Sequence, residues 1–462
     1  MQATSRPAVP PAQNLRLGHV QGRGFNPATS NRLVGSTRPV PDRRATLRAP
    51  PCAVVSRPQE SAVSDKPVDQ GFDWTKNWYP VSIVHDLDTA KPHAVDLLGG
   101  KFVLWHGGGE WHAALDRCPH RLAPLSEGKV VDDTIQCSYH GWRFAGDGAC
   151  VAIPQAEPAH LEALLANKRS CATSYPTRVQ YGLVWIWPDN AEARFIEAAS
   201  VPVAQEVPPE ATKDDKWLNF LPLFAREFPY SYDTLFENTL DPAHVPWSHD
   251  GVIGNASKAE PIALQVRQDI SPLGLQTFYR DNGAAASAGS SAIRTNVDIT
   301  LSFKAPHTLV YDTVREDGTK AKLLSYVTPT APGKCMTYAI SLDTRDNLEN
   351  RLTSLLPTWS LHQVFLLAGD GDLVLLKAQE DLLPRLEKGW KEYFLPTKAD
   401  TMVTMWRRWL ERFSSSEAGP YMLAPEDLRT ARPAALSLAK EQLLDRFHQH
   451  TASCKGQSPA DL

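Results

Sequence analysis

Two short segments of the sequence pair a cysteine with a histidine. The first reads Cys118-Pro-His120, the second reads Cys137-Ser-Tyr-His140, and sixteen residues separate His120 from Cys137. In a Rieske centre, two cysteine thiolates bind one iron of a [2Fe–2S] cluster and two neutral imidazoles bind the other iron. Two Cys-plus-His pairs, each on a tight loop, therefore predict a Rieske cluster.

A structural zinc ion is the alternative, because two cysteines and two histidines can also close a tetrahedron around Zn2+. The first pair, with one residue between Cys118 and His120, is too short for the usual zinc-finger knuckle. A string that reads His140-Gly-Trp-Arg-Phe144 follows the second pair. Both features favour the iron–sulfur cluster. Neither loop holds the additional cysteine of respiratory Rieske proteins, which favours the oxygenase type.

A second candidate metal site involves His244 and His249. Histidines five residues apart do not share one face of a regular α-helix. Pro246 lies between them, and a helix that is interrupted or widened there could bring both imidazoles to one metal. Two unconnected histidines are the alternative. A 2-His-1-carboxylate triad needs one more ligand, for which we choose Asp372, with Asp370 as the second choice. For either aspartate, the alternative is a solvated residue that caps a helix.

Asp241 has two interpretations that the sequence leaves open. It precedes Pro242, and this pair is typical of a helix N-cap followed by proline at the first helical position. The functional alternative is a carboxylate that bridges a cluster histidine to a histidine of the second metal.

The elements that must position these residues fall into two groups. Short β-favouring runs between glycine and aspartate turns extend from about Phe72 to Asp189, and they predict a small all-β domain that carries the cluster. Patterns beyond it predict antiparallel strands at 297–303, 309–314, 323–327 and 336–342, helices at 355–376 and 402–413, and a last amphipathic segment at about 432–447. We expect the substrate pocket to lie against the strands between about Val297 and Leu342.

Composition and charge exclude several classes of protein. The 462 residues are enough for two or three domains, and a net charge of −4 does not indicate nucleic acid as the main partner. The sequence lacks an apolar run of the ~18 residues that span a bilayer, so we expect any membrane contact to be peripheral. Seven widely spread cysteines do not resemble a disulfide framework, and they indicate a reducing compartment.

The first part of the chain is rich in arginine and poor in acids. Nine arginines and one acidic residue, Asp42, occur between Met1 and Arg57. This composition is typical of an organelle transit peptide, and a basic tail that stays attached is the alternative. We favour a plastid transit peptide or disordered segment at residues 1–58, followed by a linker at residues 59–71.

The sequence resembles the plant and algal pheophorbide a oxygenase family, which includes chlorophyllide a oxygenase and the Rieske proteins associated with the plastid translocon. The resemblance extends from about Phe72 to Cys454. Its strongest stretches are Asp73-Trp74 with Trp78-Tyr79-Pro80-Val81, and residues 116–128, 137–144 and 238–249. Membrane-bound relatives usually carry a C-terminal Cys-x-x-Cys before hydrophobic helices, whereas Cys454 is here followed by Lys-Gly-Gln. Anchoring and redox control through such a pair are therefore not expected.

The resemblance implies an α+β fold. An all-β Rieske [2Fe–2S] domain is followed by a helix-grip catalytic domain, which is an antiparallel sheet with helices, and by a helical C-terminal segment. We expect the Rieske domain at residues 72–190, the catalytic domain at 191–400 and the C-terminal extension at 401–462. Subunits of such oxygenases assemble head to tail, which implies a homotrimer.

The resemblance also implies a function for each matching residue. Asp241 matches the bridging aspartate, His244 and His249 match two iron ligands, Asp372 matches the third ligand, and Asn238 matches a residue near the iron. The expected cofactors are one [2Fe–2S] cluster and one mononuclear non-haem Fe(II). The expected partners are ferredoxin as electron donor, O2 and a tetrapyrrole derived from chlorophyll, and the expected location is the chloroplast. Two other functions stay open: a non-catalytic redox or translocon-associated protein, and a metal-binding module without turnover.

Overall fold

The computed structural model describes residues 72–204, 206–208, 217–281, 297–345, 352, 355–413 and 438–451. The transit peptide and linker expected at residues 1–71 lie outside the described residues, as does Cys454.

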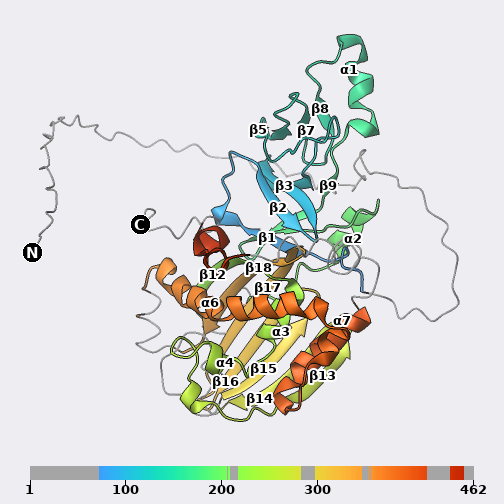
Figure 1. Ribbon diagram of the computed structural model, residues 1–462. Coiled ribbons are helices and arrows are strands. Elements are labelled where there is room, and N and C mark those ends of the chain that lie inside the picture. The colour runs from blue at the N-terminus through green and yellow to red at the C-terminus, as the bar shows by residue number, and fades with distance from the viewer. Residues whose placement is uncertain are drawn as a thin grey trace, which may run out of the picture. The chain divides into compact units, whose positions relative to one another are not determined.

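Short antiparallel strands form three sheets in the N-terminal part, residues 72–204. The sheets have the strand orders β1-β11-β10, β2-β3-β4-β9 and β5-β6-β7-β8. The strands are β1 (Tyr79–Ile83), β2 (His93–Leu97), β3 (Gly100–Gly107), β4 (Glu110–Leu115), β5 (Lys129–Val131), β6 (Thr134–Gln136), β7 (Arg143–Phe144), β8 (Cys150–Ala152), β9 (Ser174–Tyr175), β10 (Thr177–Gln180) and β11 (Leu183–Ile186), and the helices are α1 (Pro158–Leu165) and α2 (Arg194–Ser200). The β5–β8 sheet carries both Cys-plus-His loops, because the first loop precedes β5 and the second connects β6 to β7 (Figure 1).

A seven-stranded antiparallel sheet forms the centre of the C-terminal part, residues 217–451. Strands β13 to β18 pair in chain order, and β12 lies beside β18. The strands are β12 (Leu218–Phe228), β13 (Gln265–Ser271), β14 (Gly274–Asp281), β15 (Val297–Lys304), β16 (Thr308–Arg315), β17 (Lys320–Ala331) and β18 (Lys334–Asp343). Four of them contain the predicted strands, and each is longer than its alternating apolar run.

Both faces of this sheet are buried, since side chains of a strand alternate between two cores. On β17, Leu324 and Tyr326 face a core that includes Trp185 of the N-terminal part. The next residue, Val327, faces the opposite core, which it shares with Leu301 of β15. One face of the sheet therefore packs against the N-terminal part, and the other face is left for the helices.

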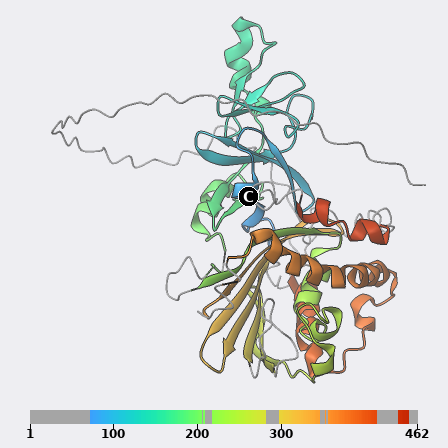
Figure 2. The same cartoon turned by 90° about the vertical axis from the view of Figure 1, so that its left-hand side faces the viewer.

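Helices cover that second face, and their buried side chains share one core with the strands (Figures 1 and 2). The helices of the C-terminal part are α3 (Tyr232–Thr239), α4 (Val245–Ser248), α6 (Thr358–Leu382), α7 (Thr401–Phe413) and α9 (Lys440–Leu443). Helix α7 packs against both the sheet and α3. The ring centroid of Trp406 lies 4.8 Å from that of Phe303 on β15 and 5.1 Å from that of Phe236 on α3. Helix α6 crosses the sheet from β12, where it begins, toward α7.

The amphipathic segment predicted at about 432–447 is described from residue 438 onward, where it forms separate helical turns and not one continuous helix. Residues 438–451, which we call the C-terminal segment, contain the single turn α9 and a turn of π-helix at Phe447–Thr451. The segment departs from a regular helix where Gln449 and His450 turn into buried contacts with β12. The helix predicted at 355–376 exists but begins and ends later, and the helix predicted at 402–413 is α7.

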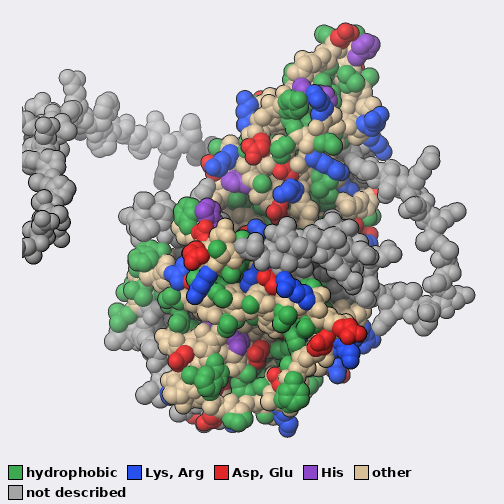
Figure 3. Space-filling view, viewed as in Figure 1, with side chains coloured by type: hydrophobic (Ala, Val, Ile, Leu, Met, Phe, Trp, Pro, Cys, Tyr) green, Lys and Arg blue, Asp and Glu red, His purple; other side chains and the backbone are tan. Residues whose placement is uncertain are grey.

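The two parts are joined by backbone hydrogen bonds. Leu98 and Gly99 donate to the carbonyl oxygens of Pro329 and Thr330, each at 2.8 Å. Within the described residues, no helix is both long and apolar enough to cross a membrane. Hydrophobic side chains are nevertheless spread over the face shown in Figure 3, and the exposed residues of α6 include Leu367, Leu375 and Leu382.

Candidate functional site

The two Cys-plus-His loops have the same backbone conformation. In the first loop, Cys118 N–H donates to the carbonyl of Ala123 at 2.7 Å, and Leu122 N–H donates to the carbonyl of Cys118 at 2.8 Å. In the second loop, Cys137 N–H donates to the carbonyl of Trp142 and Gly141 N–H donates to the carbonyl of Cys137, each at 2.9 Å. The fifth residue has a positive φ in both, at +60° for Leu122 and +73° for Gly141. The two loops thus share the same hydrogen-bonded turn.

The side chains of these loops sort by type. The thiols of Cys118 and Cys137 are buried at 2% exposure, whereas the rings of His120 and His140 lie nearer the surface, with their centroids 4.5 Å apart. His120 also stacks on Trp142 at 4.7 Å. This separation of a thiol pair from an imidazole pair fits a cluster in which each iron takes one kind of ligand.

The geometry does not fit a single zinc ion. Ligands of one tetrahedral ion converge to within a few ångströms of one another. Among the described residues, only His244, His249 and Asp372 form such a convergent set of three or more. Burial raises the pKa of Cys118 to about 12, with a further contribution from Cys137, so a metal must displace the proton of this thiol. Burial and the neighbouring His120 lower the pKa of His140, which favours the neutral imidazole that a metal binds.

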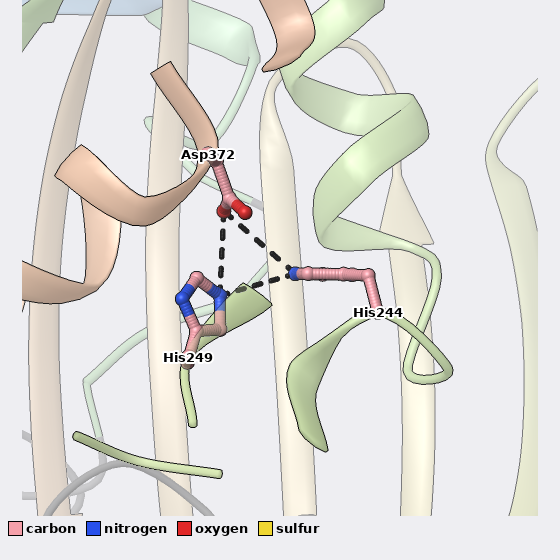
Figure 4. A group of neighbouring side chains, drawn as sticks. All are labelled: His244, His249 and Asp372. Atoms are coloured by element: carbon pink, nitrogen blue, oxygen red, sulfur yellow. Dashed lines mark hydrogen bonds and ion pairs between the residues drawn. The ribbon is translucent and has the colours of Figure 1, made fainter. Parts of the chain in front are cut away.

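The second site is formed by two histidines that flank a very short helix. Helix α4 has four residues, with His244 at its N-cap and His249 at its C-cap. This interruption brings both Nε2 atoms to 3.2 Å from each other, as Pro246 led us to expect. Asp372 reaches them from α6, with Oδ2 at 3.3 Å from His249 Nε2 and 3.7 Å from His244 Nε2 (Figure 4).

Two of these three separations match ligand atoms around one metal ion, and the third, at 3.7 Å, is slightly longer. Ligand atoms at ~2.1 Å from a metal lie about 3.0 to 3.4 Å apart when they occupy neighbouring positions. Nδ1 of His244 lies 2.6 Å from the carbonyl of Asp241, which can only accept, so this nitrogen carries the proton and Nε2 presents its lone pair. The Nε2 lone pair of His244 and the carboxylate of Asp372 thus face one point, where a cation would hold them together.

The surroundings of Asp372 hold its charge at this point. Ser248 donates its hydroxyl to Oδ1 of Asp372. Burial alone would raise the pKa of Asp372, but the hydrogen bond from His249 and the proximity of His244 outweigh burial, so its pKa lies below the usual value. Gly371 permits the close approach, since a Cβ there would lie 2.6 Å from the Ser248 carbonyl oxygen and 3.3 Å from His249 Nδ1.

Asp370 points elsewhere. One of its carboxylate oxygens accepts from Arg226 at 2.6 Å, and the other accepts from Arg446 at 2.6 Å. Of the two aspartates that we considered as a third ligand, only Asp372 therefore lies beside the imidazoles. Asp372 is also buried within α6, and not a solvated cap.

Asp241 and Asn238 lie next to the histidine site without joining it. The carboxylate of Asp241 accepts from Ala243 N–H at 2.8 Å and lies 3.8 Å from His244 Nδ1. It closes the turn before α4, whose N-cap is His244, so the helix N-cap interpretation of Asp241 is wrong. Burial raises the pKa of Asp241 against the opposing effect of His244. Asn238 stands on α3 and lines the same cavity as His244.

A cavity of about 220 Å3 extends from the three convergent side chains along the sheet. Its floor is formed by alternate residues of the strands, among them Tyr311, Leu323, Ser325 and Val327, as predicted for strands 297–342. Aromatic residues that include Phe224, Phe228, Tyr230 and Phe365 form much of the wall, and Lys322, Asp343 and Arg345 lie among the polar lining residues. The cavity is therefore suited to a flat, mostly apolar molecule with a few polar groups.

Three residues near the site were missed by the sequence reasoning. Arg226 and Ser248 gave no signal, because their partners are 144 and 124 residues away in the chain. Gly371 did give a signal, since a glycine inside a helical pattern often marks a close approach.

Comparisons with known proteins agree with this geometry. Residues 77–176 match the model of the Rieske [2Fe-2S] domain, and residues 229–415 match the Vanillate O-demethylase oxygenase C-terminal domain. Pheophorbide a oxygenase, chloroplastic, of Oryza sativa subsp. japonica is 34% identical over 448 residues, which cover 90% of this chain and 79% of the relative. Flavonoid 8-hydroxylase 2, chloroplastic, of Ocimum basilicum is 33% identical over 422 residues, 88% of this chain and 77% of the relative.

A solved structure of dicamba monooxygenase bound to dicamba has a similar fold. Its TM-score is 0.56 at 19% identity, and the match covers 79% of this chain and 99% of that structure. The predicted fold class, an all-β Rieske domain followed by a domain of sheet and helices, is confirmed.

Proposed function

The chain belongs to the pheophorbide a oxygenase family of Rieske non-haem iron oxygenases, and on this premise we propose that it oxygenates a tetrapyrrole derived from chlorophyll with electrons from a ferredoxin. As a member of that family it is an oxidoreductase with one [2Fe–2S] cluster and one mononuclear non-haem iron. In the proposed reaction one oxygen atom of O2 enters the substrate and the other leaves as water, with two electrons from the donor and two protons.

The convergence of His244, His249 and Asp372 beside an aromatic cavity carries this proposal. We assign these residues as the ligands of the mononuclear iron. An iron held by three protein ligands keeps positions open, where O2 is activated next to a bound substrate. The protein holds the His244 ring by its Nδ1–H, holds one oxygen of Asp372 through the Ser248 hydroxyl, and offers aromatic side chains that exclude water from the reacting edge of the substrate.

We assign Cys118 and Cys137 to one iron of the cluster, and His120 and His140 to the other. The thiols are buried whereas His120 is exposed, so the imidazole side is the side at which electrons can pass to a partner group. Asp241 is the candidate bridging carboxylate, because its side chain is 29% exposed while its backbone carbonyl already holds His244. Asn238 is assigned to the wall of the cavity beside the iron.

The substrate assignment has a second candidate. Two relatives at 34% identity are named pheophorbide a oxygenase, which favours a tetrapyrrole. A relative at 33% identity is named flavonoid 8-hydroxylase 2, and a phenolic ring system also suits a cavity of about 220 Å3 with aromatic walls. Both candidates are flat aromatic molecules whose edge would meet the histidine site.

Location, assembly and domain limits belong to the same proposal. Relatives named chloroplastic and the arginine-rich residues 1–58 support a plastid location, with at most peripheral membrane contact. We propose a homotrimer, with the Rieske domain at residues 72–190, the catalytic domain at 191–400 and the C-terminal extension at 401–462.

The test is a turnover assay with isotopically labelled oxygen. The purified chain, with its cluster and iron reconstituted anaerobically, is reduced by ferredoxin and its reductase and then exposed to 18O2 with pheophorbide, chlorophyllide, protochlorophyllide, a phyllobilin or a flavonoid. We expect one 18O atom in a tetrapyrrole product, and none with the His244→Ala variant.

Two results would overturn parts of this proposal. If only the flavonoid gains 18O, the substrate is a flavonoid and not a tetrapyrrole. If the cluster is reduced and reoxidised but no substrate gains oxygen, and His244→Ala behaves as wild type, the chain is the non-catalytic redox protein instead.

A further inference from the structure

The C-terminal segment, residues 438–451, contacts the helix that carries Asp372. Arg446 donates from Nε to Oδ2 of Asp370 at 2.6 Å, and its Nη2 lies 2.5 Å from the same oxygen. Gln449, which is buried, accepts at Oε1 from Nη2 and Nε of Arg226, at 2.8 and 3.2 Å. His450 donates from Nδ1 to the carbonyl of Ala225 at 2.6 Å, which fixes the segment along β12.

Arg226 connects this segment to α6. Its side chain is completely buried, so the guanidinium needs partners for all of its donors. Nη2 donates to Oδ1 of Asp370 at 2.6 Å, and Nη1 donates to the carbonyl of Leu366 at 2.9 Å. Gly369 leaves room for this contact, because a Cβ there would lie 2.8 Å from Nη1 of Arg226. Arg226 thus holds α6 at two points one turn apart.

Those two points lie in the turn of α6 that ends just before Asp372. Asp370 lies four positions after Leu366, so the two contacts fix both the rotation and the translation of the helix at that turn. A ligand that must meet two imidazoles to within ~0.5 Å depends on the position of its backbone. The carboxylate of Asp370 is the shared group, since Arg226 holds one oxygen and Arg446 holds the other.

We propose that the C-terminal segment is a positioning element of the mononuclear iron site: Arg446 and Gln449 hold the buried Arg226–Asp370 pair, and this pair sets α6 so that Asp372 meets His244 and His249. The inference rests on the proposed function, in which those three residues bind iron. Docking of the segment and binding of the metal are then linked, so each strengthens the other by the same factor.

The test measures metal binding and not turnover. The full chain with its [2Fe–2S] cluster is freed of the mononuclear metal by a chelator and titrated anaerobically with Co(II), in competition with a chromophoric chelator. The variants are Arg446→Met combined with Gln449→Met, Arg446→Lys, and Arg385→Met as the control. Arg385 is exposed in the turn that follows α6 and lies outside the contacts of Arg226 and Asp370.

We expect the double variant to bind Co(II) about 10- to 100-fold more weakly than wild type, with the cluster absorbance unchanged. The Co(II) affinity of Arg446→Lys should lie between those of wild type and the double variant, since a lysine restores one charged contact with Asp370. The control should match wild type. In wild type, saturation with Co(II) should slow amide hydrogen exchange in residues 438–451.

The outcomes separate this inference from the function on which it rests. If exchange shows that the segment is released in the double variant while the Co(II) dissociation constant stays at the wild-type value, the segment only stabilises the fold and the inference is wrong. If the double variant does not fold, Arg446→Lys decides instead, and wild-type affinity with released exchange would overturn the inference in the same way. If wild type binds no more Co(II) than His244→Ala, the proposed iron site itself is wrong.

Discussion

Replacing Gly371 by alanine tests whether α6 must pass this close to the histidine site. The new Cβ would lie 2.6 Å from the carbonyl oxygen of Ser248 and 3.3 Å from Nδ1 of His249. Close carbon–oxygen contacts in proteins are about 3.3 Å or longer. The helix or the histidine loop must therefore move by about 0.7 Å. The neighbouring atom is a backbone carbonyl, so no side-chain rotation can relieve the contact.

A displacement of that size has opposite effects on stability and on the site. Glycine in a helix interior costs about 1 kcal/mol relative to alanine, so the substitution gains helix propensity and offsets part of the strain. A site tolerates only ~0.5 Å, and the movement separates Asp372 from His249. We expect metal affinity to fall by about 10- to 100-fold, with little change in the free energy of unfolding of the metal-free protein.

Anaerobic titration with Fe(II) and urea unfolding of the metal-free chain measure the two quantities. Gln363→Ala is the matched control, because Gln363 is exposed on the same helix and also gains helix propensity. A Gly371→Ala protein that binds Fe(II) as tightly as wild type would refute the reasoning, since it would mean that the site accommodates the shift.

Three further perturbations separate the parts of the structure. Cys118→Ser should abolish the visible absorbance and the EPR signal of the reduced cluster, whereas Cys150→Ala, at a buried cysteine of the same core, should retain both; equal loss in the two variants would contradict the ligand assignment. Asp372→Asn should lose the mononuclear iron with acid-labile sulfide unchanged. Asp370→Asn should lower the free energy of unfolding by about 2–3 kcal/mol, because it weakens a buried ion pair, and should weaken metal binding without abolishing it; urea unfolding and iron analysis would contradict this if Asp372→Asn kept its iron or Asp370→Asn had wild-type stability. His307→Phe should make the free energy of unfolding depend less on pH. Burial lowers the pKa of His307 to about 4, so between pH 6.5 and 5 the imidazole takes up a proton in the unfolded state but not in the native state. This difference lowers the free energy of unfolding of the wild type by about 1.5–2 kcal/mol over that range. Urea unfolding at the two pH values gives the slope, and an unchanged slope in the variant would show that His307 is not its source.

The cluster loops could be predicted because their information is local. Cysteine and histidine stand within four residues of each other in both loops, and the backbone bonds that shape each loop close within six residues. The repeated conformation itself was not foreseen, because Leu122 has a positive φ that its residue type does not suggest.

The sequence indicated Asp372 as the first choice for the third ligand but could not exclude Asp370. Asp370 and Asp372 are two residues apart, which is about 200° around a helix, so the two carboxylates leave α6 in nearly opposite directions. Only the position of Arg226 on β12 and of the histidine loop decides which carboxylate faces which partner. The irregular path of the C-terminal segment could not be predicted for the same reason: it is set by contacts of Arg446 and Gln449 with α6 and β12, which no local pattern indicates.

Strand β17 divides its residues between two tasks. Leu323, Ser325 and Val327 line the cavity, whereas Leu324 and Tyr326 pack against the Rieske domain. A substitution at one of the first three residues therefore changes the shape of the cavity and leaves the contact between the domains intact. A substitution at Leu324 or Tyr326 changes that contact and leaves the cavity intact. The substrate preference of such proteins can therefore change through substitutions at Leu323, Ser325 and Val327, while Leu324 and Tyr326 keep the Rieske domain in its place.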